Sequence, residues 1–77
     1  MEKPKTFVIC KFADTVKLVF PDIIRMYYRI DAMTKEEFVD VHWKNETGLG
    51  YFSICVTDDS NSAMIDDVWK TLKRKFG

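Results

Sequence analysis

Residues 36–59, EEFVDVHWKNETGLGYFSICVTDD, decide the fold that this sequence predicts. Val39, Val41 and Trp43 alternate along the first part of this stretch, and apolar residues with a period of two are typical of a half-buried strand. The NETGLG segment at 45–50 contains two glycines, which suit a turn. We therefore expect two antiparallel strands joined through this segment.

The register of this hairpin follows from matching apolar side chains across the two strands. The best match gives three pairs on an inner face: Trp43 with Phe52, Val41 with Ile54, and Val39 with Val56. The opposite parity forms an outer face with four expected pairs: Phe38 with Thr57, Asp40 with Cys55, His42 with Ser53, and Lys44 with Tyr51. Aromatic residues are therefore expected on both faces of the sheet.

The N-terminal part of the chain also alternates, and residues 6–20 predict two strands around a turn at 13–15. The expected inner residues are Val8, Cys10, Phe12, Val16, Leu18 and Phe20, and the outer ones are Phe7, Ile9, Lys11, Lys17 and Val19. Pro21 and Asp22 suit the first turn of a helix, which we expect over 21–32. The competing arrangement is one helix from Ala13 to Ile30, but it would place Pro21 in a helix interior at a cost of about 3 kcal/mol.

The C-terminal segment at 60–76 predicts an amphipathic helix. Ser60, Asn61 or Ser62 can cap its start, and apolar residues recur along one face: Met64, Ile65, Val68, Trp69, Leu72 and Phe76. The sequence therefore predicts one small α+β domain over residues 1–77, with the order β-β-α-β-β-α. Its expected architecture is a four-stranded antiparallel sheet with two helices on one face.

Charge and composition narrow the classes of function. Twelve basic and twelve acidic residues cancel, which weakens the case for a general polyanion binder. The sequence has neither a charged and apolar leader nor a run of about 18 apolar residues, the pattern typical of a membrane span. We therefore expect a cytoplasmic protein with no membrane partner.

Catalytic and metal-binding chemistry has little support in the sequence. One histidine and two separated cysteines do not form the usual four-ligand zinc set, and Cys10 and Cys55 are expected on opposite faces of the sheet, where no disulfide can join them. Asp40, His42 and Cys55 share the outer parity, but a flat sheet face provides neither a pocket nor an oxyanion donor. We expect a non-enzymatic protein without a cofactor or a metal.

The aromatic outer face supports the first functional hypothesis, because a solvated face usually exposes less apolar area. Here it docks a protein partner or a second copy of the chain, and a homodimer is the expected assembly. The expected partner-binding residues are Phe7, Ile9, Phe38, His42 and Tyr51. The chain would then be a regulatory or inhibitory module, a viral or plasmid-borne effector as readily as a host subunit. The open alternative is that a helix covers part of this face, so that some of these residues belong to the core.

The second hypothesis is that the same face binds single-stranded RNA or DNA, with bases stacked on its aromatics and phosphates bound by lysines. The expected nucleic-acid-binding residues are Lys11, Lys17, Lys44, Lys70, Lys73, Arg74 and Lys75. The zero net charge and the lack of a glycine-aromatic signature of RNA-recognition strands argue against it.

Overall fold

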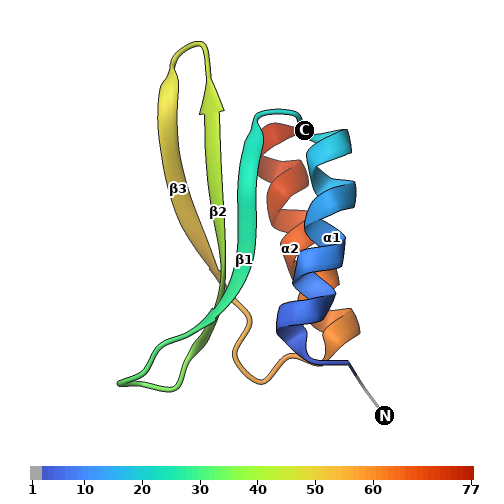
Figure 1. Ribbon diagram of the computed structural model, residues 1–77, viewed down its shortest axis with the longest axis vertical. Coiled ribbons are helices and arrows are strands. Elements are labelled where there is room, and N and C mark those ends of the chain that lie inside the picture. The colour runs from blue at the N-terminus through green and yellow to red at the C-terminus, as the bar shows by residue number, and fades with distance from the viewer. Residues whose placement is uncertain (1–2) are drawn as a thin grey trace.

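The computed structural model describes residues 3–77, and these fold in the order α-β-β-β-α (Figure 1). The elements are α1 (Lys5–Val19), β1 (Ile23–Ile30), β2 (Glu37–Asn45), β3 (Gly48–Cys55) and α2 (Asn61–Phe76). The three strands form one antiparallel sheet in the order β1-β2-β3. The expected four-stranded sheet and the β-β-α-β-β-α order are therefore wrong, although the protein is α+β.

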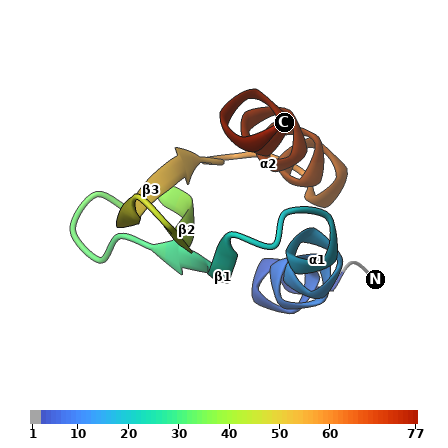
Figure 2. The ribbon, with the colours of Figure 1, turned by 90° about the horizontal axis from the view of Figure 1, so that it is seen from above.

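Both helices lie on the same side of the sheet (Figure 2). The core fills the space between the two layers and is built from buried residues of every element: Ile9, Ala13, Val16, Phe20, Ile23, Met26, Val39, Val41, Ile54, Val56, Met64, Val68 and Leu72. Trp69 of α2 packs against the rings of Phe12 and Phe20, with centroids 6.2 and 5.5 Å away. The other face of the sheet has no helix over it within the described residues.

Helix α1 replaces the two strands that were expected over residues 6–20. Ile9, Ala13 and Val16 recur at i, i+4 and i+7, and all three are buried. This spacing places them on one stripe of a helix, a second periodicity that coexists with the period-two alternation. The helical stripe covers the core, whereas the alternating residue Cys10 is exposed.

Strand β1 occupies most of the segment that was expected as a helix over 21–32. The backbone N–H of Ile23 donates to the carbonyl of Phe20 at 3.0 Å, which closes a β-turn with Pro21 at its second position. Proline's fixed φ suits this position as well as it suits a first helical turn. The β-branched and aromatic run that follows then pairs with β2, and a register shift between Ile23 and Arg25 leaves Ile24 exposed.

The β2–β3 hairpin has the expected parity, but its register differs by two residues. Val41 lies opposite Phe52 and His42 opposite Tyr51, because only two residues lie between the paired residues Asn45 and Gly48. The Asn45 Oδ1 atom accepts hydrogen bonds from the Thr47 N–H and hydroxyl, at 2.9 and 2.6 Å, and so stabilises the turn. Gly48, at φ +151°, completes it.

Helix α2 confirms the expected C-terminal helix. It is capped by Ser60, whose Oγ accepts a hydrogen bond from the Ala63 N–H at 3.2 Å. Its buried residues Met64, Val68 and Leu72 follow the predicted apolar face. Within residues 3–77, no helix combines the length and the apolar character needed to cross a membrane.

Candidate functional site

The uncovered side of the sheet, here called the outer face, is formed by all three strands. Three strands contribute to it with alternate residues, and their cross-strand pairing follows from the observed register. Its members are Arg25, Tyr27 and Arg29 from β1; Phe38, Asp40, His42 and Lys44 from β2; and Leu49, Tyr51, Ser53 and Cys55 from β3.

An ion pair lies at the centre of the outer face. Asp40 is 5% exposed and accepts hydrogen bonds from Arg29 Nε at 2.7 Å and Nη2 at 3.3 Å. Ser53 Oγ donates to the same carboxylate at 2.6 Å. Burial alone would raise the pKa of Asp40, but the hydrogen bonds from Arg29 and Ser53 outweigh it and hold this pKa below its ordinary value. The Asp40 carboxylate is thus neutralised within the face.

Three rings form an aromatic stack beside this ion pair. His42 lies between Tyr27 and Tyr51, with ring centroids 5.6 and 5.4 Å apart and planes 24° and 21° from parallel. The Tyr27 hydroxyl and His42 Nε2 are also hydrogen-bonded at 3.2 Å. Offset stacking at these distances partly covers the rings with one another. The three rings therefore form one cluster in which each ring is held in place by its neighbours, rather than a set of separate, open rings.

Two arginines lie over rings of the outer face. The guanidinium of Arg25 is 4.7 Å from the centroid of Tyr27, and that of Arg29 is 4.8 Å from the centroid of Phe38. Tyr51 remains the most open ring, with 69% of the residue exposed. The outer face thus presents aromatic and cationic groups together, held by contacts within the face.

The residues expected to bind a partner separate into two groups. Phe38, His42 and Tyr51 do lie on the outer face. Phe7 lies instead on α1, where the ammonium groups of Lys3 and Lys11 lie 4.8 and 5.7 Å from its ring centroid. Ile9 has no exposed surface and belongs to the core. Phe7 and Ile9 were misplaced because α1 was expected as two strands.

The residues expected to bind nucleic acid lie on separate layers of the molecule. Lys11 and Lys17 belong to α1, and Lys70, Lys73, Arg74 and Lys75 belong to α2, so these six lie on the helical layer (Figure 2). Lys44 alone of the expected set is on the outer face. The structure therefore does not join this basic set and the sheet aromatics into one track.

Sequence reasoning missed the contribution of β1 to the outer face. Arg25, Tyr27 and Arg29 were assigned to a helix, with the two arginines on its polar stripe and Tyr27 on its apolar face. Their alternation with Met26 and Tyr28 is the signal that could have placed them on one side of a strand.

The outer face does not bring Asp40, His42 and Cys55 together as a nucleophilic site would require. Cys55 pairs with Phe38, whereas His42 pairs with Tyr51, so the row of Asp40 and Ser53 lies between the thiol and the imidazole. The carboxylate of Asp40 is bound by Arg29 and Ser53. Among residues 3–77, no three histidine, cysteine, aspartate or glutamate side chains gather as metal ligands would.

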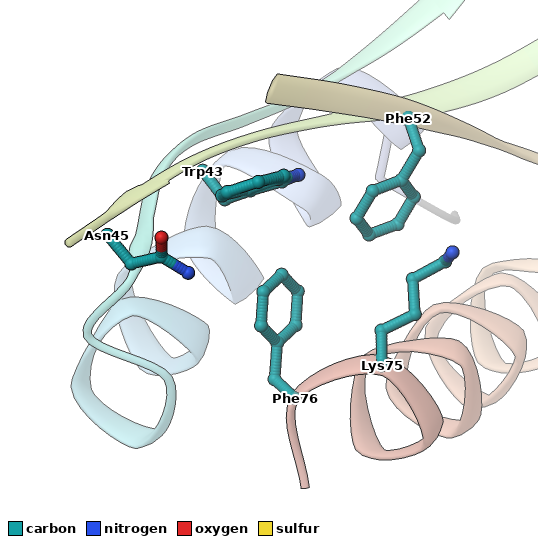
Figure 3. Close-up of a pocket in the computed structure, with 5 residues that line it drawn as sticks. All are labelled: Trp43, Asn45, Phe52, Lys75 and Phe76. Atoms are coloured by element: carbon teal, nitrogen blue, oxygen red, sulfur yellow. The ribbon is translucent and has the colours of Figure 1, made fainter. Parts of the chain in front are cut away.

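A pocket lies on the inner side of the sheet, between the β2–β3 hairpin and the end of α2 (Figure 3). It is an open pocket of about 300 Å³, lined by Trp43, Asn45, Phe52, Lys75 and Phe76. Comparison with known proteins finds no family that matches this chain, no similar curated protein and no similar solved structure.

Proposed function

We propose that this protein is a small non-enzymatic module that regulates or inhibits a partner protein by surface contact, with the outer face as its docking surface. The observation that carries this proposal is the braced cluster of Tyr27, His42 and Tyr51 beside the arginines. Aromatic and arginine side chains are enriched among interface anchors, and rings that are already fixed lose little conformational entropy on binding.

The ring arrangement favours a protein over single-stranded nucleic acid. Bases stack on open ring faces, but Tyr27 and His42 are partly covered by their neighbours and Phe38 by Arg29. Phosphates need a cationic track, and most of the lysines lie on the helical layer. Nucleic acid therefore remains the second candidate, supported by Arg25 and Lys44.

The charges of the outer face favour a partner with acidic groups. Arg29 is paired with Asp40, but Arg25 and Lys44 have no carboxylate partner within the described residues. A two-fold contact between two copies would bring these positive faces together, which costs energy unless anions separate them. The expected homodimer therefore stays a prediction, which light scattering tests by measuring the molecular mass in solution.

A cytoplasmic location is also part of this proposal. The two free, exposed cysteines suit a reducing compartment.

The two cysteines provide a footprinting test, since Cys55 lies on the outer face and Cys10 is exposed on α1. Binding proteins are first captured with the wild type, with Tyr51→Ser and with the control Phe7→Ser. A protein that binds the wild type and Phe7→Ser but not Tyr51→Ser is purified as the partner. Alkylation of Cys10 and Cys55 is then measured in the native complex of the chain with this partner.

We expect the purified partner to slow alkylation of Cys55 by at least about tenfold, with little change at Cys10. Protection of Cys10 alone would contradict the assignment of the outer face. Tight binding of oligo(dT) or oligo(U) with a steep salt dependence, lost in Tyr51→Ser, would favour the nucleic-acid candidate instead.

A further inference from the structure

The pocket between the hairpin and the end of α2 is walled by three aromatic rings. Figure 3 shows Trp43, Phe52 and Phe76 around the space, with Asn45 at one side and the Lys75 stem at the other. The rings of Phe52 and Phe76 have centroids 6.1 Å apart. Its volume of about 300 Å³ is at the lower end of the range of small-molecule sites, roughly 300–1,000 Å³, and suits a single ring with a short polar tail.

Gly50 makes room for the indole of Trp43, which forms one wall of the pocket. This residue lies opposite Trp43 in the ladder, and a Cβ atom at position 50 would be 2.8 Å from Cζ2 of the indole. The missing side chain thus lets the indole lie against the β3 backbone. A larger residue would push the indole away from the strand, and the space occupied by the pocket would change shape.

The polar groups of the pocket without partners are all hydrogen-bond donors. Asn45 Oδ1 is already occupied by the N–H and hydroxyl of Thr47, which leaves its Nδ2 group for a ligand. Neither Trp43 Nε1 nor Lys75 Nζ has an acceptor within residues 3–77, in contrast to Lys70, which pairs with Asp66 at 2.8 Å. The Lys75 ammonium instead lies 4.6 Å from the centroid of Phe52. A ligand must therefore bring an acceptor, and the charge of Lys75 favours an anionic one.

We propose that this pocket binds an aromatic carboxylate, with its ring between the aromatic walls and its carboxylate on Lys75. The ligand can be a small molecule or the C-terminal residue of a peptide, because both present the same ring and carboxylate. This site is on the opposite side of the sheet from the outer face, so the proposal does not depend on the docking function.

The test uses the full chain labelled with ¹⁵N and titrated with 3-phenylpropionate. The indole N–H signal of Trp43 reports on the pocket, whereas that of Trp69, packed against Phe12 and Phe20, is the internal control. We expect a saturable shift of the Trp43 signal with little change at Trp69. The amide analogue 3-phenylpropanamide should bind at least tenfold more weakly, since it lacks the negative charge.

Two variants test the assigned groups. Lys75→Gln should weaken binding of 3-phenylpropionate at least tenfold, while Lys73→Gln, the same change in the same helical turn but outside the pocket lining, should change it less than twofold. Gly50→Ala should also abolish the shift through the displaced indole. If Gly50→Ala disturbs the fold by circular dichroism, the lysine pair alone decides.

Three results would overturn the proposal: no saturable shift of Trp43 up to 10 mM ligand (about the weakest affinity worth assigning), equal binding of the acid and the amide, or unchanged binding in Lys75→Gln. A hexapeptide that ends in phenylalanine then distinguishes the two sources. Tighter binding of its free acid than of 3-phenylpropionate, lost on C-terminal amidation, indicates a peptide C-terminus. Binding of 3-phenylpropionate without binding of the peptide indicates a small molecule.

Discussion

Glu37 and Tyr28 are joined by a hydrogen bond of 2.5 Å from the tyrosine hydroxyl to carboxylate Oε1. Lys5 donates to the same oxygen at 2.6 Å, and the backbone N–H of Asp58 donates to Oε2 at 2.9 Å. This one carboxylate thereby ties the first turn of α1 and the β3–α2 connection to strands β1 and β2.

These contacts set opposite pKa shifts in the two partners. Hydrogen bonds from Lys5, then Tyr28, then the Asp58 backbone lower the pKa of Glu37 to about 2, against the opposing effect of burial. Burial, followed by the hydrogen bond and the charge of Glu37, raises the pKa of Tyr28 to about 12. Each shift favours the protonation state that makes the hydrogen bond.

Stability should therefore fall at both ends of the pH scale. The contribution of Glu37 is complete above its unfolded pKa and is lost as the pH falls from about 5 toward 2. The contribution of Tyr28 is complete below its unfolded pKa and is lost as the pH rises from about 10 through 12. We expect Glu37→Gln to lower the free energy of unfolding at pH 7 by on the order of 2 kcal/mol.

Urea unfolding of the wild type and Glu37→Gln across this pH range provides the measurement. The difference between the two proteins should shrink toward pH 2, because the wild-type carboxylate becomes protonated as the pH approaches its folded pKa of about 2. Lys5 side-chain truncation should reproduce part of the effect. A constant difference from pH 7 to pH 2 would contradict the assigned role of the Glu37 charge.

The placement of α1 predicts unequal effects at two neighbouring residues. Ile9 is fully buried, and Ile9→Ala should lower the free energy of unfolding by about 2 to 5 kcal/mol. Phe7 is 42% exposed, and Phe7→Ala should cost less than about 1 kcal/mol. Chemical denaturation compares the two variants, and a larger loss from Phe7→Ala would be incompatible with this helix orientation.

Both cysteines should react with a thiol reagent in the native protein. Cys10 was expected in the core, but it is exposed on α1, and Cys55 is exposed on β3. Counting the thiols that react with a chromogenic disulfide reagent without denaturant should give two per chain, and Cys10→Ser and Cys55→Ser should each give one. A native count of one would mean that one of these surfaces is covered.

The central ion pair predicts different roles for two arginines of the outer face. Arg29→Gln leaves the Asp40 carboxylate buried with Ser53 as its main donor, and we expect a loss of about 1 to 3 kcal/mol and a raised pKa of Asp40. Arg25→Gln is the matched control, since Arg25 has no carboxylate partner in the described part of the chain. It should cost less than about 0.5 kcal/mol. Carboxyl ¹³C titration measures the pKa of Asp40 in all three proteins.

The parts of the fold with a single periodicity could be predicted from the sequence. Strands β2 and β3 alternate, and α2 has one apolar stripe and a serine cap. Residues 6–30 contain signals for both helix and strand, and Pro21 suits either a turn or a helix start. Here tertiary packing decides, because only the helical stripe of Ile9, Ala13 and Val16 covers the sheet.

Only the part of the candidate site on β2 and β3 could be predicted from the sequence. Phe38, His42 and Tyr51 were placed on the outer face because parity survives a register error of two residues. The partners that brace them from β1 were missed with that strand. The pocket could not be inferred, since it depends on the apposition of Trp43 with Gly50 and on where α2 ends.

The strand order has a consequence for folding kinetics. Each strand pairs with its neighbour along the chain, through connections at 31–36 and 46–47, so both hairpins need only short loop closures. Distant contacts, such as Phe12 with Trp69, join the two helices. Because the hairpins close short loops whereas α2 packs against residues far away in the chain, we expect the hairpins to form early and α2 to dock last. The pocket that Phe76 completes would then form only in the final step of folding.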